Sequence, residues 1–244
     1  MLFGMLFSFI SLILYLILSY FESKPFIDKL NNLEQLEYKL ANKMLDVNMK
    51  NIFNMKDQHE MIDRNKINRS IITEGSSFSL VGETGASYID PSLRRHWDYL
   101  KEKLDNGATF KLLIINPFSN SKQFRNKLNK VKQKIDPKLN LNLLFGLNKE
   151  YSNIEVRFTN EVYCSLFFSE NKMMYDPYHV GMITSRLENY FLAFYLENTE
   201  EDFSYFKLLK NHFDNLWDNS TSINDFIKEN KSTLKKLHYK FVKN

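Results

Sequence analysis

The order of predicted elements between residues 78 and 117 constrains the fold more than any other feature of the sequence. A short strand is predicted at 78–82, where small and β-branched residues precede a glycine-rich turn. A helix follows, which Asp90 caps and Gly107 ends, because aspartate accepts from the free N–H groups of a first turn and glycine favours helix ends. The nearly continuous apolar run at 108–117 is typical of a strand covered on both faces. The sequence therefore predicts an α/β domain with parallel strands.

The rest of the domain continues the alternation of strands and helices. The further predicted elements are a polar helix at 121–134, a strand at 153–159, a hairpin of apolar strands at 162–177, amphipathic helices at 184–198 and 202–220, and a basic helical tail at 221–244. The predicted fold class is thus α/β, with a mixed sheet flanked by helices.

The first twenty residues carry no charged side chain. About 20 apolar residues in a helix match the thickness of a bilayer core, so we expect a transmembrane helix at 1–21. A cleaved signal peptide is the alternative, but no basic residue precedes the run and no small-x-small cleavage site follows it. Lys24 and Lys29 lie just after the run, which favours a single-pass membrane protein with its globular domain in the cytoplasm.

A helical stalk is predicted at 25–65, because helix-forming residues dominate this stretch. Leu33, Leu40 and Val47 repeat every seven residues, as in a short coiled coil. Such a coiled coil would pair two chains, so a homodimer is expected. The alternative, a single helix packed on the domain at 66–220, is equally open.

Composition restricts the possible functions. The formal net charge is +4, without a block of like charges, which permits contact with an anionic membrane surface or a phosphate ligand. Nucleic acid is not expected as a partner, because lysines and arginines are spread along the chain beside 29 acidic residues. Neither a cofactor nor a metal is expected. The single cysteine, Cys164, lies in an apolar strand pattern and is expected to be an inert core thiol.

Several stretches together resemble a known family. The run "NGATFKLLIINPFSNSKQFR", the strand "IEVRF" and the apolar hairpin are similar to one half of a phospholipase D-like domain, over about residues 70–220. The family carries a His-x-Lys-x4-Asp motif on this hairpin. Tyr163, Ser165 and Glu170 stand at the corresponding positions, so the resemblance implies the frame of the site without its nucleophile and phosphate clamp.

Two sets of candidate residues follow. His179, close after the hairpin and near Asp176, could rebuild a catalytic site with Tyr163 and Glu170, although a lone histidine is more often structural. The glycine-rich stretch "SLVGETGASY" could form an anion nest at a strand-to-helix passage, with arginines adding positive charge; a surface turn and ordinary ion pairs are the alternatives. The candidate ligand-binding residues are Gly82, Gly85, Ser87, Arg94, Arg95 and Arg186.

The function expected from these features is that of a membrane-anchored, non-catalytic module. It would sense or bind a nucleotide, another phosphate-containing ligand or a partner protein, and a role in bacterial signalling or defence follows by fold-level analogy alone. A phosphodiesterase or phospholipase with a site rebuilt around His179 is the alternative. A purely structural anchor that forms oligomers is a third possibility.

Overall fold

The computed structural model describes residues 2–129, 137–178, 182–183, 186–187, 192–201 and 204–237. The chain divides into two compact units, Met1–Asp46 and Val47–Asn244. The first unit is the helix α1 (Leu2–Asp46), which continues through Pro25. The predicted boundary between a membrane span and a stalk is therefore not seen as a break in this helix.

The expected membrane span at 1–21 needs correction. Among the described residues, no helix combines the length and the apolar character that crossing a membrane requires. A single-pass membrane localisation is therefore not supported. The cytoplasmic placement of the domain was derived from the flanks of that span, so it loses its basis as well.

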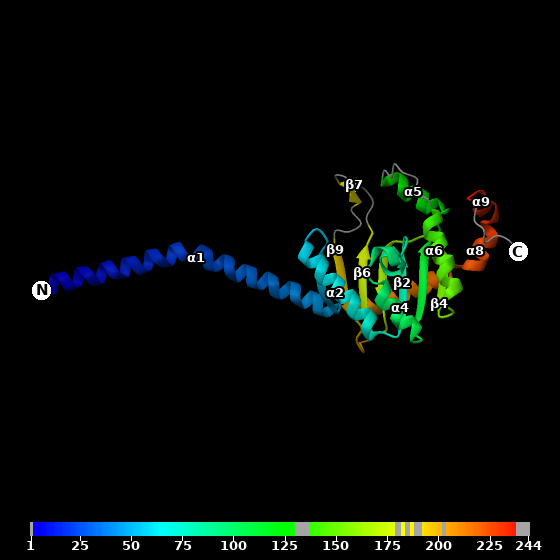
Figure 1. The fold of residues 1–244 in the computed structure, drawn as a ribbon. Helices are drawn as coiled ribbons and strands as arrows, with labels where there is room; N and C mark the ends of the chain where they lie inside the picture. The colour runs from blue at the N-terminus through cyan, green and yellow to red at the C-terminus, as the bar shows by residue number, and fades with distance from the viewer. Residues whose placement is uncertain are drawn as a thin grey trace. The chain divides into compact units, whose positions relative to one another are not determined.

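The second unit is built on a mixed sheet, which has eight strands among the described residues (Figure 1). The strands are β1 (Met49–Asn54), β2 (Ser77–Gly82), β3 (Thr109–Ile115), β4 (Ile154–Thr159), β5 (Cys164–Phe168), β6 (Lys172–Pro177), β9 (Leu192–Glu197) and β10 (Thr221–Ser222). Their order is β1-β9-β6-β5-β2-β3-β4-β10. The central β2, β3 and β4 are parallel, and the other pairs are antiparallel. The short strands β7 (Met182–Ile183) and β8 (Arg186–Leu187) pair separately.

Helices cover both faces of the sheet. The helical elements of the second unit are α2 (Gln58–Glu74), α3 (Ala86–Ile89), the 3-10 helix η1 (Pro91–Leu93), α4 (Trp97–Asp105), α5 (Asn120–Leu128), α6 (Pro137–Glu150), α7 (Tyr205–Asp218), α8 (Ile223–Glu229) and α9 (Lys231–Lys236). Apolar side chains of α2, α4, α6 and α8 share one buried cluster with one face of the sheet. Those of α7, such as Phe213 and Trp217, share a second cluster with the opposite face. The unit is therefore a three-layer α/β structure, as expected apart from the membrane span.

The strand–helix–strand prediction for 78–117 is confirmed. β2 and β3 are parallel, and Gly107 has a φ of +90° after α4. Asp90 does cap a helical turn, since its carboxylate accepts from the Ser92 N–H at 2.9 Å. The predicted helix is nevertheless interrupted, because Arg94 adopts a left-handed φ of +48° between η1 and α4. The hairpin of β5 and β6 is confirmed too.

Two predicted helices are wrong in part. The helix predicted at 184–198 instead contains β9, which lies between β1 and β6 in the sheet. The stalk predicted at 25–65 contains β1, after which α2 begins. Ala193 and Leu196 of β9 are fully buried. Pairing on both sides of β9 therefore outweighs the local helical pattern.

Candidate functional site

The ends of five strands meet at one edge of the sheet. The parallel strands β2, β3 and β4 end at this edge, and the antiparallel β5 begins there. The segment 160–163 joins the end of β4 to the start of β5, so it passes the ends of β3 and β2, which lie between them in the sheet. β6 also ends here, because it is antiparallel to β5. Ligands of open α/β sheets commonly bind outside the carboxyl ends of strands, so a ligand site is expected at this edge.

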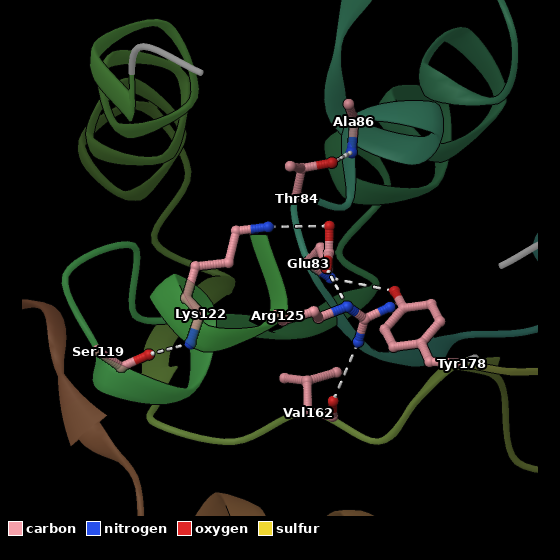
Figure 2. Close-up of polar contacts among 8 residues, drawn as sticks. All are labelled: Glu83, Thr84, Ala86, Ser119, Lys122, Arg125, Val162 and Tyr178. Carbon is pink, nitrogen blue, oxygen red and sulfur yellow. Dashed lines mark hydrogen bonds and ion pairs between the residues drawn. The ribbon is translucent and has the colours of Figure 1, made fainter. Parts of the chain in front are cut away.

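A carboxylate and two cations form the centre of this edge (Figure 2). Glu83, the first residue after β2, places Oε2 3.0 Å from Lys122 Nζ and Oε1 2.8 Å from Arg125 Nε. The Lys122 and Arg125 side chains are only 12% and 9% exposed, and that of Glu83 is 22% exposed. The cluster of Glu83, Lys122, Arg125 and Tyr178 is called the edge cluster below.

The sequence around α5 explains why both cations reach Glu83. Ser119 caps the helix, since its Oγ accepts from the Lys122 N–H at 3.2 Å. Lys122 and Arg125 are three residues apart, which places their side chains on one face of α5. Phe124 is 62% exposed, so it does not share that buried face. The helix therefore directs its cations inward and an aromatic ring outward.

Tyr178 completes the edge cluster. The Arg125 guanidinium lies over its ring, with Cζ 4.1 Å from the ring centroid, a cation–π contact. The Tyr178 hydroxyl accepts from the backbone N–H of Glu83 at 3.2 Å. Gly82 leaves room for this contact, because a Cβ there would lie 3.3 Å from the hydroxyl oxygen. Tyr178 thus contacts the guanidinium through its ring and the start of the turn through its hydroxyl group.

The hydrogen bonds of Arg125 are incomplete. Its Nη1 donates to the Val162 carbonyl at 3.4 Å. Its Nε is close enough to Glu83 for an ion pair, without the alignment of a hydrogen bond. Its Nη2 is buried and has no hydrogen-bond acceptor among the described residues. A buried guanidinium with an unused donor is costly unless another acceptor is bound.

The turn after β2 is set by local geometry. Gly85 has a φ of +64°, and a Cβ there would come within 2.9 Å of a Leu80 methyl carbon. The Thr84 Oγ1 accepts from the Ala86 N–H at 3.3 Å, which opens α3. Gly85 therefore belongs to the frame of the turn and packs against the core, while Glu83 carries the charge.

A second polar group is buried on the face of the sheet that α2 and α4 cover. Asp176 of β6 pairs with Arg64 of α2 at 2.6 Å, and the two side chains are 7% and 15% exposed. The Tyr88 hydroxyl donates to Asn68 Oδ1 at 3.2 Å. The His96 ring stacks on Tyr88 with centroids 5.1 Å apart.

The pKa values in this group reflect its burial. Burial, followed by the charges of Arg64, Arg69 and Arg95, lowers the pKa of His96 to about 4. Burial also raises the pKa of the Tyr88 hydroxyl well above its ordinary value. Both side chains are therefore uncharged at neutral pH.

The structure places the predicted binding residues in different settings. Gly82 lies within the site, and Gly85 shapes its turn. Ser87 is half-buried on α3, whereas Arg94 and Arg95 are exposed. In the described part of the chain, no ion pair or hydrogen bond joins these two arginines to the edge cluster. Arg186 lies in β8, where it pairs with Ile183.

The alternative catalytic residues are not gathered at one point. Tyr163 and Glu170 lie beyond opposite ends of β5. The Tyr163 side chain is exposed and its hydroxyl donates to the Glu161 carboxylate. The Glu170 carboxylate accepts from Ser76 Oγ at 2.6 Å. Asp176 is committed to Arg64, and His179 lies outside the described residues.

The pKa of Glu170 is lowered on balance. Partial burial raises it, but hydrogen bonds from the side chain and backbone of Ser76 and from the backbone of Ser77 outweigh that effect. Glu170 therefore acts as a carboxylate that ties the hairpin turn to the start of β2. This role is structural and lies at the edge of the sheet opposite the edge cluster.

The side chains that carry the site were missed from the sequence. Glu83, Lys122, Arg125 and Tyr178 come from three distant stretches that only the sheet topology brings together. The one available signal was the serine cap followed by Lys122 and Arg125 in "SNSKQFR", which predicts two cations on one helical face.

Comparison with known proteins does not assign the chain to a family. No family model matches it, and no curated protein does. Among solved structures it is similar to TrmBL2, an archaeal chromatin protein described as having a novel mode of DNA binding. The TM-score is 0.44 and the identity 11%, over 82% of this chain and 66% of that one, which is just under two thirds of its length. A likeness this distant carries no argument about fold or function.

Three sequence-based expectations are corrected by these findings. Membership of the phospholipase D superfamily is not supported, since neither a family model nor a curated protein matches the chain. A membrane is not supported as a partner. The expectation that nucleic acid is not a partner is not upheld either: the similar solved structure is described as binding DNA, and at a TM-score of 0.44 it argues neither for nor against such a partner here.

Proposed function

We propose that this chain is a binding module for a small ligand with a phosphate or similar anionic group, held at Lys122 and Arg125. The observation that carries the proposal is the convergence of two nearly buried cations on one carboxylate, with one buried guanidinium nitrogen left without an acceptor. The edge cluster thus has one more positive than negative charge. An anionic oxygen would balance this charge and accept the hydrogen bond that Arg125 Nη2 does not make.

Physical chemistry favours phosphate among such anions. A buried cation is costly unless it is paired and fully hydrogen-bonded, and one carboxylate does not meet this condition for two cations. The planar guanidinium matches phosphate oxygens in a two-point contact, while an ammonium group supplies a flexible point charge. Arg125 and Lys122 offer one of each. The cation–π contact with Tyr178 fixes the plane of the guanidinium before a ligand arrives.

Binding can be tested by calorimetry and thermal unfolding of the full chain with inorganic phosphate, pyrophosphate and nucleoside triphosphates. We expect heat of binding and a higher melting temperature with at least one of them. Lys122→Met should abolish both effects, because it removes one of the two cations. The matched control is Lys127→Met, which removes an exposed lysine from the same helix. Equal binding by the wild type and Lys122→Met would refute this site.

A second candidate function is a phosphodiesterase with His179 as its catalytic group. One observation favours it: His179 directly follows Tyr178, whose ring packs on Arg125. The test is hydrolysis of a generic phosphodiester by the full chain, with His179→Ala as the paired variant. Turnover that disappears in His179→Ala would establish an enzyme. Absence of turnover in both proteins would leave the binding module as the proposal.

A further inference from the structure

We propose that Glu83 is an internal occupant of the anion site, which only a dianionic phosphate group displaces. The ligand would then carry a terminal phosphate, as in a phosphate monoester or a nucleoside polyphosphate, rather than a phosphodiester. This inference rests on the proposed function and names the class of ligand for the same site. It starts from the position of one carboxylate.

The Glu83 side chain is the most exposed of the three charged groups. It is 22% exposed, against 12% for Lys122 and 9% for Arg125. The carboxylate can therefore leave toward solvent, whereas the cations are held in the protein. Once it has left, two buried cations share a space without a counter-charge.

The attachment of Glu83 allows this exchange without a change in the fold. Its backbone N–H is held by the Tyr178 hydroxyl, and the following turn is fixed by Gly85 and by the Thr84 side chain. Among the described residues, ion pairs with Lys122 and Arg125 hold the carboxylate itself. Rotation about side-chain bonds is then enough to empty the site.

A terminal phosphate competes better than the carboxylate does. It carries about −1.5 to −2 charges at neutral pH and three acceptor oxygens. It can replace Glu83 in the ion pairs with Lys122 and Arg125, and can also accept from the buried Arg125 Nη2 that lacks an acceptor. A phosphodiester has a single charge, like the carboxylate, and must compete with a group already tethered in place. Glu83 therefore selects for charge.

The experiment is titration calorimetry of the full chain near pH 7.5 with two probes, inorganic phosphate and dimethyl phosphate. We expect the wild type to bind inorganic phosphate, and to bind dimethyl phosphate at least about tenfold more weakly. Glu83→Gln should bind inorganic phosphate about tenfold more tightly than the wild type, because the tethered competitor is neutral. The matched control is Glu155→Gln, which removes a carboxylate 2.7 Å from Arg157 on β4 and should change nothing.

Each outcome separates this inference from the proposed function. Phosphate binding by the wild type with equal or weaker binding by Glu83→Gln would overturn the competitor role while leaving the site in place. Equal binding of the two probes by the wild type would overturn the ligand class. Binding of neither probe by wild type or Glu83→Gln would overturn this inference, and the proposed function would fall with it only if pyrophosphate and nucleoside triphosphates did not bind either. If Glu83→Gln does not fold, Glu83→Asp serves instead, because the shorter side chain cannot hold both ion pairs and should also tighten phosphate binding.

Discussion

The buried histidine beside Tyr88 predicts a specific pH dependence of stability. His96 is 2% exposed and its ring stacks on Tyr88. Burial first, and then the nearby arginines, lower its pKa from 6.5 to about 4 in the folded chain. In the unfolded chain these causes are absent, so the imidazole titrates near its ordinary value. Folding is therefore linked to the release of a proton from this ring in acidic solution.

The size and sign of the effect follow from this difference. Between pH 6.5 and about 4, the unfolded chain binds a proton at His96 that the folded chain does not. The free energy of unfolding then falls by about 1.4 kcal/mol for each pH unit of acidification. The loss over the whole window is about 3 kcal/mol, a large part of the stability of a typical domain. Above pH 6.5 the contribution is fully present, and below pH 4 it falls no further.

Urea unfolding at several pH values between 4 and 8 measures this contribution. His96→Phe keeps an aromatic ring against Tyr88 but cannot bind a proton, so its stability should fall less steeply with acidification than that of the wild type. His59→Gln is the matched control, because it removes an exposed histidine from α2. Parallel curves for the wild type and His96→Phe between pH 4 and 6.5 would refute the reasoning.

Three further predictions test the frame of the site. Gly85→Ala should lower the free energy of unfolding in urea by about 2–3 kcal/mol, from a positive φ and a steric overlap, whereas Gly107→Ala, in open space, should lose only about 1 kcal/mol; equal losses would contradict this. Arg64→Met should cost about 3–5 kcal/mol by leaving the buried Asp176 without its ion pair, and Arg64→Met with Asp176→Asn should cost less than the single change; a more severe double variant would speak against it. Cys164 is buried and its pKa is raised to about 12 by burial, so a thiol reagent at pH 8 should label it slowly until urea unfolds the chain; rapid labelling of the folded protein would argue otherwise.

The sequence was most informative where local chemistry decides the structure. Asp90 and Gly107 mark helix ends by their own conformational preferences, and the apolar run of β3 needs no partner to be recognised as a buried strand. The hairpin of β5 and β6 is also a local contact. These elements were predicted because neighbours in the chain determine them.

The wrong predictions concern segments whose secondary structure depends on partners distant in the sequence. β9 and β1 pair with each other across much of the chain length, and β9 pairs with β6 on its other side. The stretch "LAFYLE" contains good helix formers, and nothing within it reveals two flanking strands. Loss of helical propensity is small beside the backbone hydrogen bonds and buried area that two neighbours supply.

The candidate site shows the same limit at the level of single side chains. Gly82 could be found from the sequence because a glycine-rich turn is a local signal. Lys122 and Lys127, in contrast, are two lysines on the same helix. One is 12% exposed against Glu83, and the other is exposed. They lie on different faces of α5. The position of α5 beside the end of β2 decides which face is buried, and that position depends on the parallel order of the sheet. Burial of a charged side chain, rather than its type or spacing, therefore identifies this site, and burial is a property of the fold that no single stretch of sequence contains.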